Sequence, residues 1–361
     1  MVNKVIQAVA GAGKTYKITH ELDSNKRYLF LTFTNGNVRN LENGLLESMA
    51  NPTNYYVSTF SKFLIDWVIN PFKPMLLPSK VREYKGFTNF QPVNDARLPG
   101  YYTQDNAYHY IDKSKSLFLS RISELVMYQK KMSKEFLTLV FNRMSKYIDE
   151  IVIDEFQDLT GNDFKILSLL MKQKEVKITL VGDVYQSNVS KSDQRKPAPY
   201  IGNWEEITQV LYKNFGKRIE INTASLRNSR RIGEGVANFI ETHLDIVIKS
   251  DGRHTGGTNL IKTRTDAISV LNMNPTILIW NKKINVPIQY KSCTWGYSKG
   301  DTLELVLIIL TSSTEKFLFS DSKNEKLSVE IRNKLYVAMS RSQGDVYFIS
   351  PTLWKEVLTY L

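Results

Sequence analysis

The chain has 361 residues, 42% of them hydrophobic and 23% charged, a balance that excludes a wholly disordered protein and allows two domains, each with its own core. Its formal net charge of +12 favours a polyanionic partner, because lysine and arginine side chains gain free energy by releasing counterions from phosphates, although codon bias toward lysine and asparagine is another source of such charge. The single cysteine, Cys293, excludes an intrachain disulfide and a cysteine-based zinc cluster, which is typical of a reducing compartment.

Neither a signal peptide nor a membrane span is predicted. A glycine-rich motif starts as early as Ala8, which leaves no room for a leader, and no apolar run approaches the roughly eighteen residues that a membrane helix needs. We therefore expect an intracellular protein, cytoplasmic or otherwise, with no membrane partner.

The first predicted element is a phosphate-binding loop. The apolar pair Val5-Ile6 predicts a buried strand that leads into residues 8–15, A-V-A-G-A-G-K-T, with alanine where the usual motif begins with glycine. A strand that turns through glycines into a helix points backbone N–H groups at an anion, although the same pattern also fits an ordinary turn. Lys14 is expected to bridge the β- and γ-phosphates and the Thr15 hydroxyl to hold Mg²⁺. The expected phosphate-binding residues are Ala10, Gly11, Ala12, Gly13, Lys14 and Thr15.

The next two predicted strands, 28–33 and 55–60, both end in hydroxyl groups beside an aromatic ring. Ligands bind at the carboxyl edge of a parallel sheet, and such residues suit a phosphodiester backbone and a stacked base. The alternative is that the two phenylalanines are core residues and the polar groups cap helices. The candidate strand-binding residues are Phe33, Thr34, Asn35, Thr59 and Phe60.

Residues 71–146 differ in composition and are interpreted as an inserted, mostly helical, basic subdomain. Prolines punctuate its first part, and its second part is rich in lysine and arginine. Those charges fit a nucleic-acid path and equally a solvated helix face, and the sequence leaves both open. The basic residues are Lys113, Lys115, Arg121, Lys130, Lys131, Lys134, Arg143 and Lys146.

An apolar strand at 151–153 then delivers two acids that complete a nucleotide-hydrolysing site. Asp154 is expected to hold Mg²⁺ and Glu155 to activate the attacking water. A further buried strand, 178–181, opens into G-D-V-Y-Q, and the amide of Gln186 is placed to touch both the γ-phosphate and the water.

Taken in order, these motifs resemble those of superfamily 1 helicases of the UvrD/Rep type. The first half contains A-x-x-G-x-G-K-T, T-F-T-N, T-F, D-E-F-Q-D and G-D-x-x-Q. In the second half, residues 226–231 (L-R-N-S-R-R) resemble the N-Y-R-S box, with serine for tyrosine, and residues 298–302 (S-K-G-D-T) resemble the S-K-G-L-E box. Residues 335–342 (L-Y-V-A-M-S-R-S) resemble L-Y-V-A-x-T-R-A.

The resemblance implies an α/β fold with two RecA-like domains that hold ATP and Mg²⁺ between them and move along single-stranded DNA, with RNA left open. The first domain would comprise 1–70 and 147–215, and the second 216–361. Arg230 and Arg341 would reach the γ-phosphate, with Arg227 and Arg231 as alternatives to Arg230. Thr294 would meet the strand, and Lys299, also a nucleic-acid-binding residue, would couple the nucleotide to the strand. A DNA helicase of 3′ to 5′ polarity is the implied activity.

The chain departs from this family in three places. It has no glutamine motif before the phosphate loop, so Tyr16 is the expected stacking ring for adenine. Residues 187–191 lack the usual aromatic segment after Gln186, and only short linkers stand where large members insert an accessory domain. The alternative function is therefore an ATP-gated binding or loading subunit that acts with a protein partner such as a nuclease or replication factor.

Overall fold

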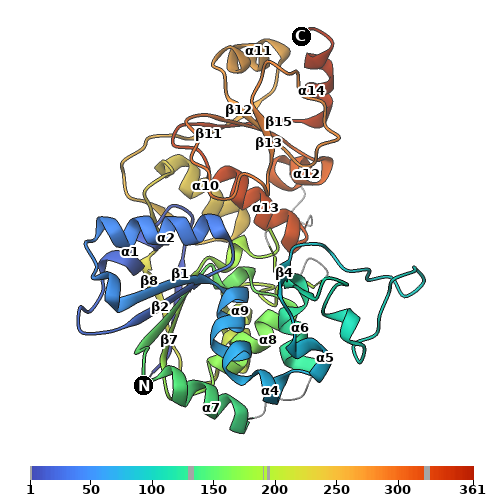
Figure 1. Ribbon diagram of the computed structural model, residues 1–361. Helices are drawn as coiled ribbons and strands as arrows, with labels where there is room; N and C mark the ends of the chain where they lie inside the picture. Colours follow the sequence, from blue (N-terminus) through green and yellow to red (C-terminus); the bar gives the residue numbers. More distant parts are fainter. Residues whose placement is uncertain (1, 129–133, 190, 193–195, 321–325) are drawn as a thin grey trace.

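The computed structural model describes residues 2–128, 134–189, 191–192, 196–320 and 326–361. These build two large parallel β-sheets and two short strand pairs, with helices around them (Figure 1). The predicted α/β class with parallel sheets is confirmed. Lys130 and Lys131, two of the predicted basic residues, lie outside the described residues.

The first sheet has six strands in the order β3-β2-β6-β7-β1-β8. Strands β2 and β6 are buried at every residue, as continuous apolar runs covered on both faces must be. Because all neighbours are parallel, the loops that follow β1, β6 and β7 leave the same edge of the sheet. The strands are β1 (Lys4–Ala8), β2 (Tyr28–Thr32), β3 (Tyr55–Thr59), β6 (Glu150–Asp154), β7 (Lys177–Gly182) and β8 (Glu220–Leu226).

Helices connect these strands, and several begin at side-chain caps. Thr34 caps α2 by accepting the N–H of Asn37 at 3.1 Å, and Asn203 and Glu206 form a capping box at the start of α9. The polar groups of Thr34 are therefore partly used as a helix cap. The helices of this domain are α1 (Lys14–His20), α2 (Asn35–Glu47), α3 (Phe60–Phe63), α8 (Gly161–Leu170) and α9 (Trp204–Phe215).

The insertion is less helical than its sequence predicts. Residues 89–106 contain turns and bends but no helix or strand, and the prolines of this stretch, which cannot donate a backbone hydrogen bond, account for part of the difference. Its elements are α4 (Lys73–Leu76), α5 (Ser79–Arg82), β4 (Gly86–Thr88), β5 (Ser116–Phe118), α6 (Ile122–Tyr128) and α7 (Lys134–Met144).

The second sheet has five strands in the order β11-β15-β14-β12-β13. Its strands are β11 (Thr258–Ile261), β12 (Thr276–Ile279), β13 (Ser292–Thr294), β14 (Val306–Ile309) and β15 (Val346–Ile349). A short pair, β9 (Asn228–Ser229) and β10 (Lys249–Ser250), lies apart from it. The helices are α10 (Glu234–Leu244), α11 (Arg264–Asn272), α12 (Ser312–Phe319), α13 (Val329–Met339) and α14 (Pro351–Leu358).

The boundary between the domains lies later in the chain than the sequence predicts. Strand β8 pairs in parallel with β1, so residues 220–226 belong to the first sheet and not to a second domain that starts at 216. The isolated sequence of β8 could not reveal this, because all its residues except the buried Leu226 are exposed or half-buried and its partner lies more than two hundred residues away.

One hydrophobic core passes through both halves of the molecule, and helix α13 lies at the junction in Figure 1. The buried cluster joins strands of the first sheet to Leu335 and Tyr336 of α13. The two halves are therefore packed against each other rather than linked by chain alone. Among the described residues, no helix is both long and apolar enough to cross a bilayer.

Candidate nucleotide site and strand-facing surface

The predicted phosphate loop joins β1 to α1 as expected. Gly11 and Gly13 have φ angles of +73° and +81°, a region that favours glycine. A Cβ atom on Gly11 would lie 2.7 Å from Ser229 Oγ and 2.8 Å from Arg231 Cβ. Gly11 therefore serves a second purpose that the motif did not predict, since it lets the segment after β8 approach the loop.

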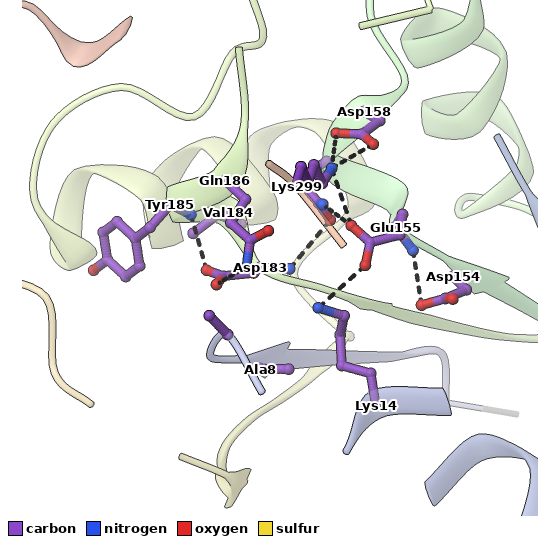
Figure 2. Close-up of polar contacts among 12 residues, drawn as sticks. Ala8, Lys14, Asp154, Glu155, Asp158, Asp183, Val184, Tyr185, Gln186 and Lys299 are labelled. Atoms are coloured by element: carbon purple, nitrogen blue, oxygen red, sulfur yellow. Dashed lines mark hydrogen bonds and ion pairs between the residues drawn. The ribbon is translucent and has the colours of Figure 1, made fainter. Parts of the chain in front are cut away.

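Lys14 and Glu155 face each other across the site. Lys14 Nζ lies 3.1 Å from Glu155 Oε1, and both side chains are only 13% exposed (Figure 2). Burial alone lowers the pKa of Lys14, but the charges of Glu155, Asp183 and Asp154 outweigh it and raise that pKa. The phosphate-loop lysine is thus held charged beside the carboxylate expected to activate water.

Asp154 ends β6 and Glu155 follows it in a left-handed conformation, with φ of +54°. This turn lets the Glu155 N–H donate to Asp154 Oδ1 at 3.0 Å. Burial, and then the charge of Glu155, raises the pKa of Asp154 to about 7. Burial acts in the same direction on Glu155, but Lys14 and Lys299 reverse it and hold the pKa of Glu155 well below its usual range.

The donor set suits Mg²⁺, which prefers oxygen ligands and takes few of them from the protein. Asp154 supplies a buried carboxylate whose Oδ1 is used by Glu155, and Thr15 supplies a hydroxyl from the first turn of α1. The described residues contain no cluster of three or more acidic, histidine or cysteine ligands. These residues therefore fit a metal that is completed by nucleotide oxygens rather than a closed protein cage.

Lys299, which is expected to couple the nucleotide to the strand, lies beside the acidic motif. Its ammonium comes from the second domain and lies 2.6 and 2.8 Å from the two carboxylate oxygens of Asp158 and 3.2 Å from Glu155 Oε2 (Figure 2). Burial raises the pKa of Asp158 to about 7 despite the opposing charge of Lys299. Lys14, Glu155, Lys299 and Asp158 thus form one chain of ion pairs across both domains. In this arrangement Lys299 faces the candidate nucleotide cleft, and its contact with a strand stays a prediction.

Gln186 lies at the site but is held by a residue that sequence reasoning missed. Its amide donates to Asp183 Oδ2 at 2.8 Å, and Asp183 also accepts from Gln7 Nε2 at 3.2 Å and from the N–H of Tyr185 at 3.1 Å. A fourth donor is the hydroxyl of Tyr336, at 2.9 Å. The available signal was an acid placed directly after the buried strand β7, the same pattern that identified Asp154.

Arg341 is almost wholly buried, at 2% exposure. Its Nε donates to the Val337 carbonyl at 2.9 Å and its guanidinium to Ser340 Oγ at 3.0 Å, and among the described residues it forms no ion pair. Burial, and then the nearby charge of Arg231, lowers its pKa to about 9. A buried cation without a carboxylate partner is costly, so this position favours an anionic ligand.

Arg230 reaches the phosphate loop, whereas the side chain of the alternative Arg231 bonds to residues of the second domain. The Arg230 N–H donates to the Gly11 carbonyl at 2.9 Å, and its guanidinium lies 5.2 Å from the centre of the Tyr16 ring. Arg231 Nε instead donates to Thr302 Oγ1 at 3.0 Å. Arg230 is exposed, so its side chain is free to turn toward a phosphate. Tyr16 is half-exposed beside the loop, and its role toward adenine stays a prediction.

Most of the predicted strand-facing residues of the first domain meet in one pocket of about 560 Å³. It is lined by Phe33, Thr34, Asn35 and Thr59 together with residues of the insertion, among them Phe87. Phe60 does not line this pocket. Phe60 is 2% exposed and the centre of its ring lies 5.8 Å from the centre of the Phe63 ring, so Phe60 is a core residue. Thr59 and Phe60 are adjacent residues at the start of α3. The sequence did not show that Thr59 lines the pocket while the ring of Phe60 lies in the core.

Thr294 lines a separate pocket of about 680 Å³ in the second domain. Lys282, Lys283 and the exposed ring of Tyr297 share that pocket. The two lysines and the exposed tyrosine were not predicted as site residues, although a basic pair beside an aromatic residue is a recognisable pattern for nucleic-acid binding.

Residues 89–188 match the family model of the UvrD/REP helicase N-terminal domain, and this match confirms the resemblance to UvrD-type superfamily 1 helicases. A solved complex of Arterivirus nonstructural protein 10 (helicase) with DNA is 14% identical, with 97% of this chain and 61% of that chain covered and a TM-score of 0.47. The structure of PRRSV helicase is 12% identical, with 97% and 52% covered and a TM-score of 0.45. The chain thus spans between half and two thirds of these proteins. No curated protein sequence matches it.

Proposed function

We propose that this chain, in which residues 89–188 match a UvrD/REP helicase N-terminal domain, is an ATP-driven motor that moves along single-stranded DNA and unwinds duplex with 3′ to 5′ polarity. The observation that carries the proposal is the contact of 3.1 Å between Lys14 of the phosphate loop and Glu155 of the acidic motif. That contact brings a phosphate-binding lysine and a candidate general base into one buried cleft.

In the proposed reaction, backbone N–H groups of the loop and the Lys14 ammonium bind the β- and γ-phosphates of ATP. Thr15 and Asp154 would hold Mg²⁺, which supplies charge neutralisation to the phosphate oxygens when bound. Once Lys14 engages phosphate, Glu155 Oε1 loses its ion-pair partner and becomes a stronger base. Glu155 then orients the attacking water and accepts its proton.

In this proposal the second domain contributes positive charge to the nucleotide site. Arg341 is buried without an ion pair among the described residues, and Arg230 contacts the loop through its backbone. A guanidinium offers a planar fork of donors to phosphate oxygens as charge develops on them. Closure of the cleft on ATP would bring both arginines to the γ-phosphate, and its reopening after hydrolysis would move one domain along the strand.

The strand itself would bind across the pocket that contains Phe33 and the pocket that contains Thr294. Hydroxyl and amide groups there suit phosphodiester oxygens, and the rings of Phe33 and Tyr297 suit stacked bases. Because the net charge is +12, binding should weaken steeply as salt rises. An affinity that does not change with salt would contradict this part of the proposal.

One observation favours a second candidate, an ATP-gated loading subunit that acts with a nuclease or replication protein. Strand β12 ends at Ile279 and β13 begins at Ser292, so only residues 280–291 stand at the point where large family members insert an accessory domain. A motor without that domain can hydrolyse ATP and translocate while relying on a partner for unwinding.

The assignment of ATP hydrolysis is tested by measuring ATPase rates without polymer and with single-stranded DNA, single-stranded RNA or duplex. Lys14→Ala and Glu155→Gln should each reduce the strand-stimulated rate to background. Lys17→Ala is the matched control, because Lys17 lies in the same helix and, within the part of the chain that the structure describes, forms its ion pair with Glu21. Strand-stimulated hydrolysis that survives either site variant would overturn the proposal.

Unwinding and polarity are tested on duplexes with a single 3′ or 5′ tail. The motor proposal expects ATP-dependent displacement from the 3′-tailed substrate by the chain alone. Strand-stimulated ATPase without displacement from either substrate would favour the loading subunit. Displacement from the 5′-tailed substrate alone would reverse the assigned polarity.

A further inference from the structure

Helix α13 of the second domain is bonded to the turn Asp183–Ser187 of the first domain at two successive turns of the helix. Tyr336 donates its hydroxyl to Asp183 Oδ2 at 2.9 Å, and Asn333 Nδ2 donates to the Ser187 carbonyl at 2.9 Å. Residues three apart on a helix lie on the same face, so both bonds are made by one face of α13. The guanidinium of Arg332 also lies over the ring of Tyr185, at 5.7 Å from its centre.

The Tyr336 hydroxyl connects three segments that are far apart in the sequence. It accepts the N–H of Ala10, in the phosphate loop, at 2.9 Å, and it donates to Asp183. Asp183 in turn accepts the amide of Gln186 at 2.8 Å. A single hydroxyl therefore joins the phosphate loop to the turn that carries Gln186, and it does so from the other domain.

This polar interface is buried. Tyr336, Asn333, Asp183 and Ser187 are all fully buried, and Gln186 is 3% exposed. A buried polar group that loses its partner carries the full cost of desolvation, so the partners are held in fixed positions and move together. Arg341 follows the end of α13 directly and bonds to the carbonyl of Val337 in that helix. A shift of the turn is thus passed to the helix that positions Arg341.

We propose that the bonds of Tyr336 and Asn333 to the turn Asp183–Ser187 form the linkage that couples the nucleotide site to the second domain, with the Tyr336 hydroxyl as its central element. Tyr336 is a positioning residue, because it contacts the phosphate loop and Asp183. The inference rests on the proposed motor function. It also accounts for the segment after Gln186, whose first residue Ser187 is turned inward toward α13 instead of supplying an aromatic ring to a strand.

The test is Tyr336→Phe, which removes one oxygen atom and keeps the packed ring. Its matched control is Tyr200→Phe: Tyr200 is also fully buried, but its hydroxyl has no hydrogen-bond partner among the described residues. Asn333→Ala is a second variant that breaks the other bond of the linkage. Thermal melting of all three variants shows that each is folded before coupling is measured.

Two quantities report coupling. The first is the factor by which a non-hydrolysable ATP analogue changes the Kd for a fluorescent single-stranded oligonucleotide, which measures the free energy shared by the two sites. The second is the ratio of ATPase kcat with and without strand. In Tyr336→Phe both factors should fall at least fivefold toward one. Asn333→Ala should shift both factors in the same direction, and Tyr200→Phe should leave them as in the unmodified protein.

Coupling factors within twofold of the unmodified protein in a folded Tyr336→Phe variant would overturn the linkage. Equal losses in Tyr336→Phe and Tyr200→Phe would also overturn it, because they would show an effect of any lost buried hydroxyl. An unmodified chain that binds strand and hydrolyses ATP with no coupling between them would overturn it as well. Failure of the motor function is distinct, since the unmodified chain would then hydrolyse no ATP, either with or without strand.

Discussion

The candidate nucleotide cleft and the candidate strand-binding pocket of the first domain lie at the same edge of one sheet. The charges of the side chains that line them differ. The cleft contains buried charges that compensate one another across both domains, as in the chain from Lys14 through Glu155 and Lys299 to Asp158. The pocket is lined mainly by neutral polar groups and two rings, and Thr34 and Asn35 are exposed. Removing one group should therefore have a large effect in the cleft and a modest, additive one in the pocket.

The largest effect is expected at Arg341. Arg341→Ala should lower the strand-stimulated ATPase kcat by about 10³-fold or more, because in the proposed reaction it would remove a charge and a donor fork from the transition state. Arg341→Lys keeps the charge without the fork and should recover only part of the rate. ATPase kinetics with a thermal melt of each variant check this, and a folded Arg341→Ala variant within tenfold of the unmodified rate would contradict it.

The neighbouring rings Phe33 and Phe60 should separate binding from stability. Phe60→Ala should lower the free energy of unfolding by about 3–5 kcal/mol, because it leaves a cavity in the core. Phe33→Ala should instead weaken strand binding by about 1–3 kcal/mol through the loss of a stacking surface. Urea unfolding and fluorescence anisotropy with a labelled oligonucleotide measure the two quantities. Equal losses of stability and of strand affinity in the two variants would contradict the placement of Phe33 in the pocket and Phe60 in the core.

Asp183 should behave as a structural acceptor. Asp183→Asn puts an amide N–H₂ against a set of donors and should lower the free energy of unfolding by about 1–3 kcal/mol. Asp66→Asn is the control, since among the described residues Asp66 pairs with Lys62, at 2.7 Å and exposed to solvent, and the change should alter stability by less than about 1 kcal/mol. Equal stability of the two variants in urea would show that the buried acceptor contributes nothing.

The smallest predicted effect is a pH dependence of metal binding. Burial raises the pKa of Asp154 to about 7, so the carboxylate is protonated below that pH and Mg²⁺ must displace the proton. The Mg²⁺ concentration needed for half-maximal binding of a fluorescent non-hydrolysable ATP analogue should rise about tenfold from pH 8 to pH 6. Glu155→Gln removes the second cause of the raised pKa of Asp154. In this variant the midpoint of the pH dependence of Mg²⁺ binding should therefore lie at lower pH. An unchanged midpoint in Glu155→Gln would show that the charge of Glu155 does not raise the pKa of Asp154.

The local motifs of this chain predicted several strands of the first sheet and the residues that meet at its carboxyl edge. Continuous apolar runs predicted β2, β6 and β7, and the residues that end or follow a parallel strand must lie at one edge of the sheet, which is why Lys14, Asp154 and Glu155 meet as expected. The sequence did not separate Phe33 from Phe60, because each follows a strand and only packing decides which ring is covered. It also overstated the helical content of the insertion, where prolines and long turns override helix-forming residues.

The sequence by itself determined β1, β2, β3, β6 and β7, the phosphate loop and the acids at the end of β6, because these depend on short patterns of apolar and glycine residues. Only the tertiary structure decided which residues meet across the two halves. The bond between Tyr336 and Asp183 joins residues 153 positions apart, and that between Tyr336 and Ala10 joins residues 326 apart. The placement of β8 in the first sheet and of Lys299 beside Asp158 also depends on such distant partners. Contacts of this kind are set by how the two sheets pack, and no local pattern encodes them.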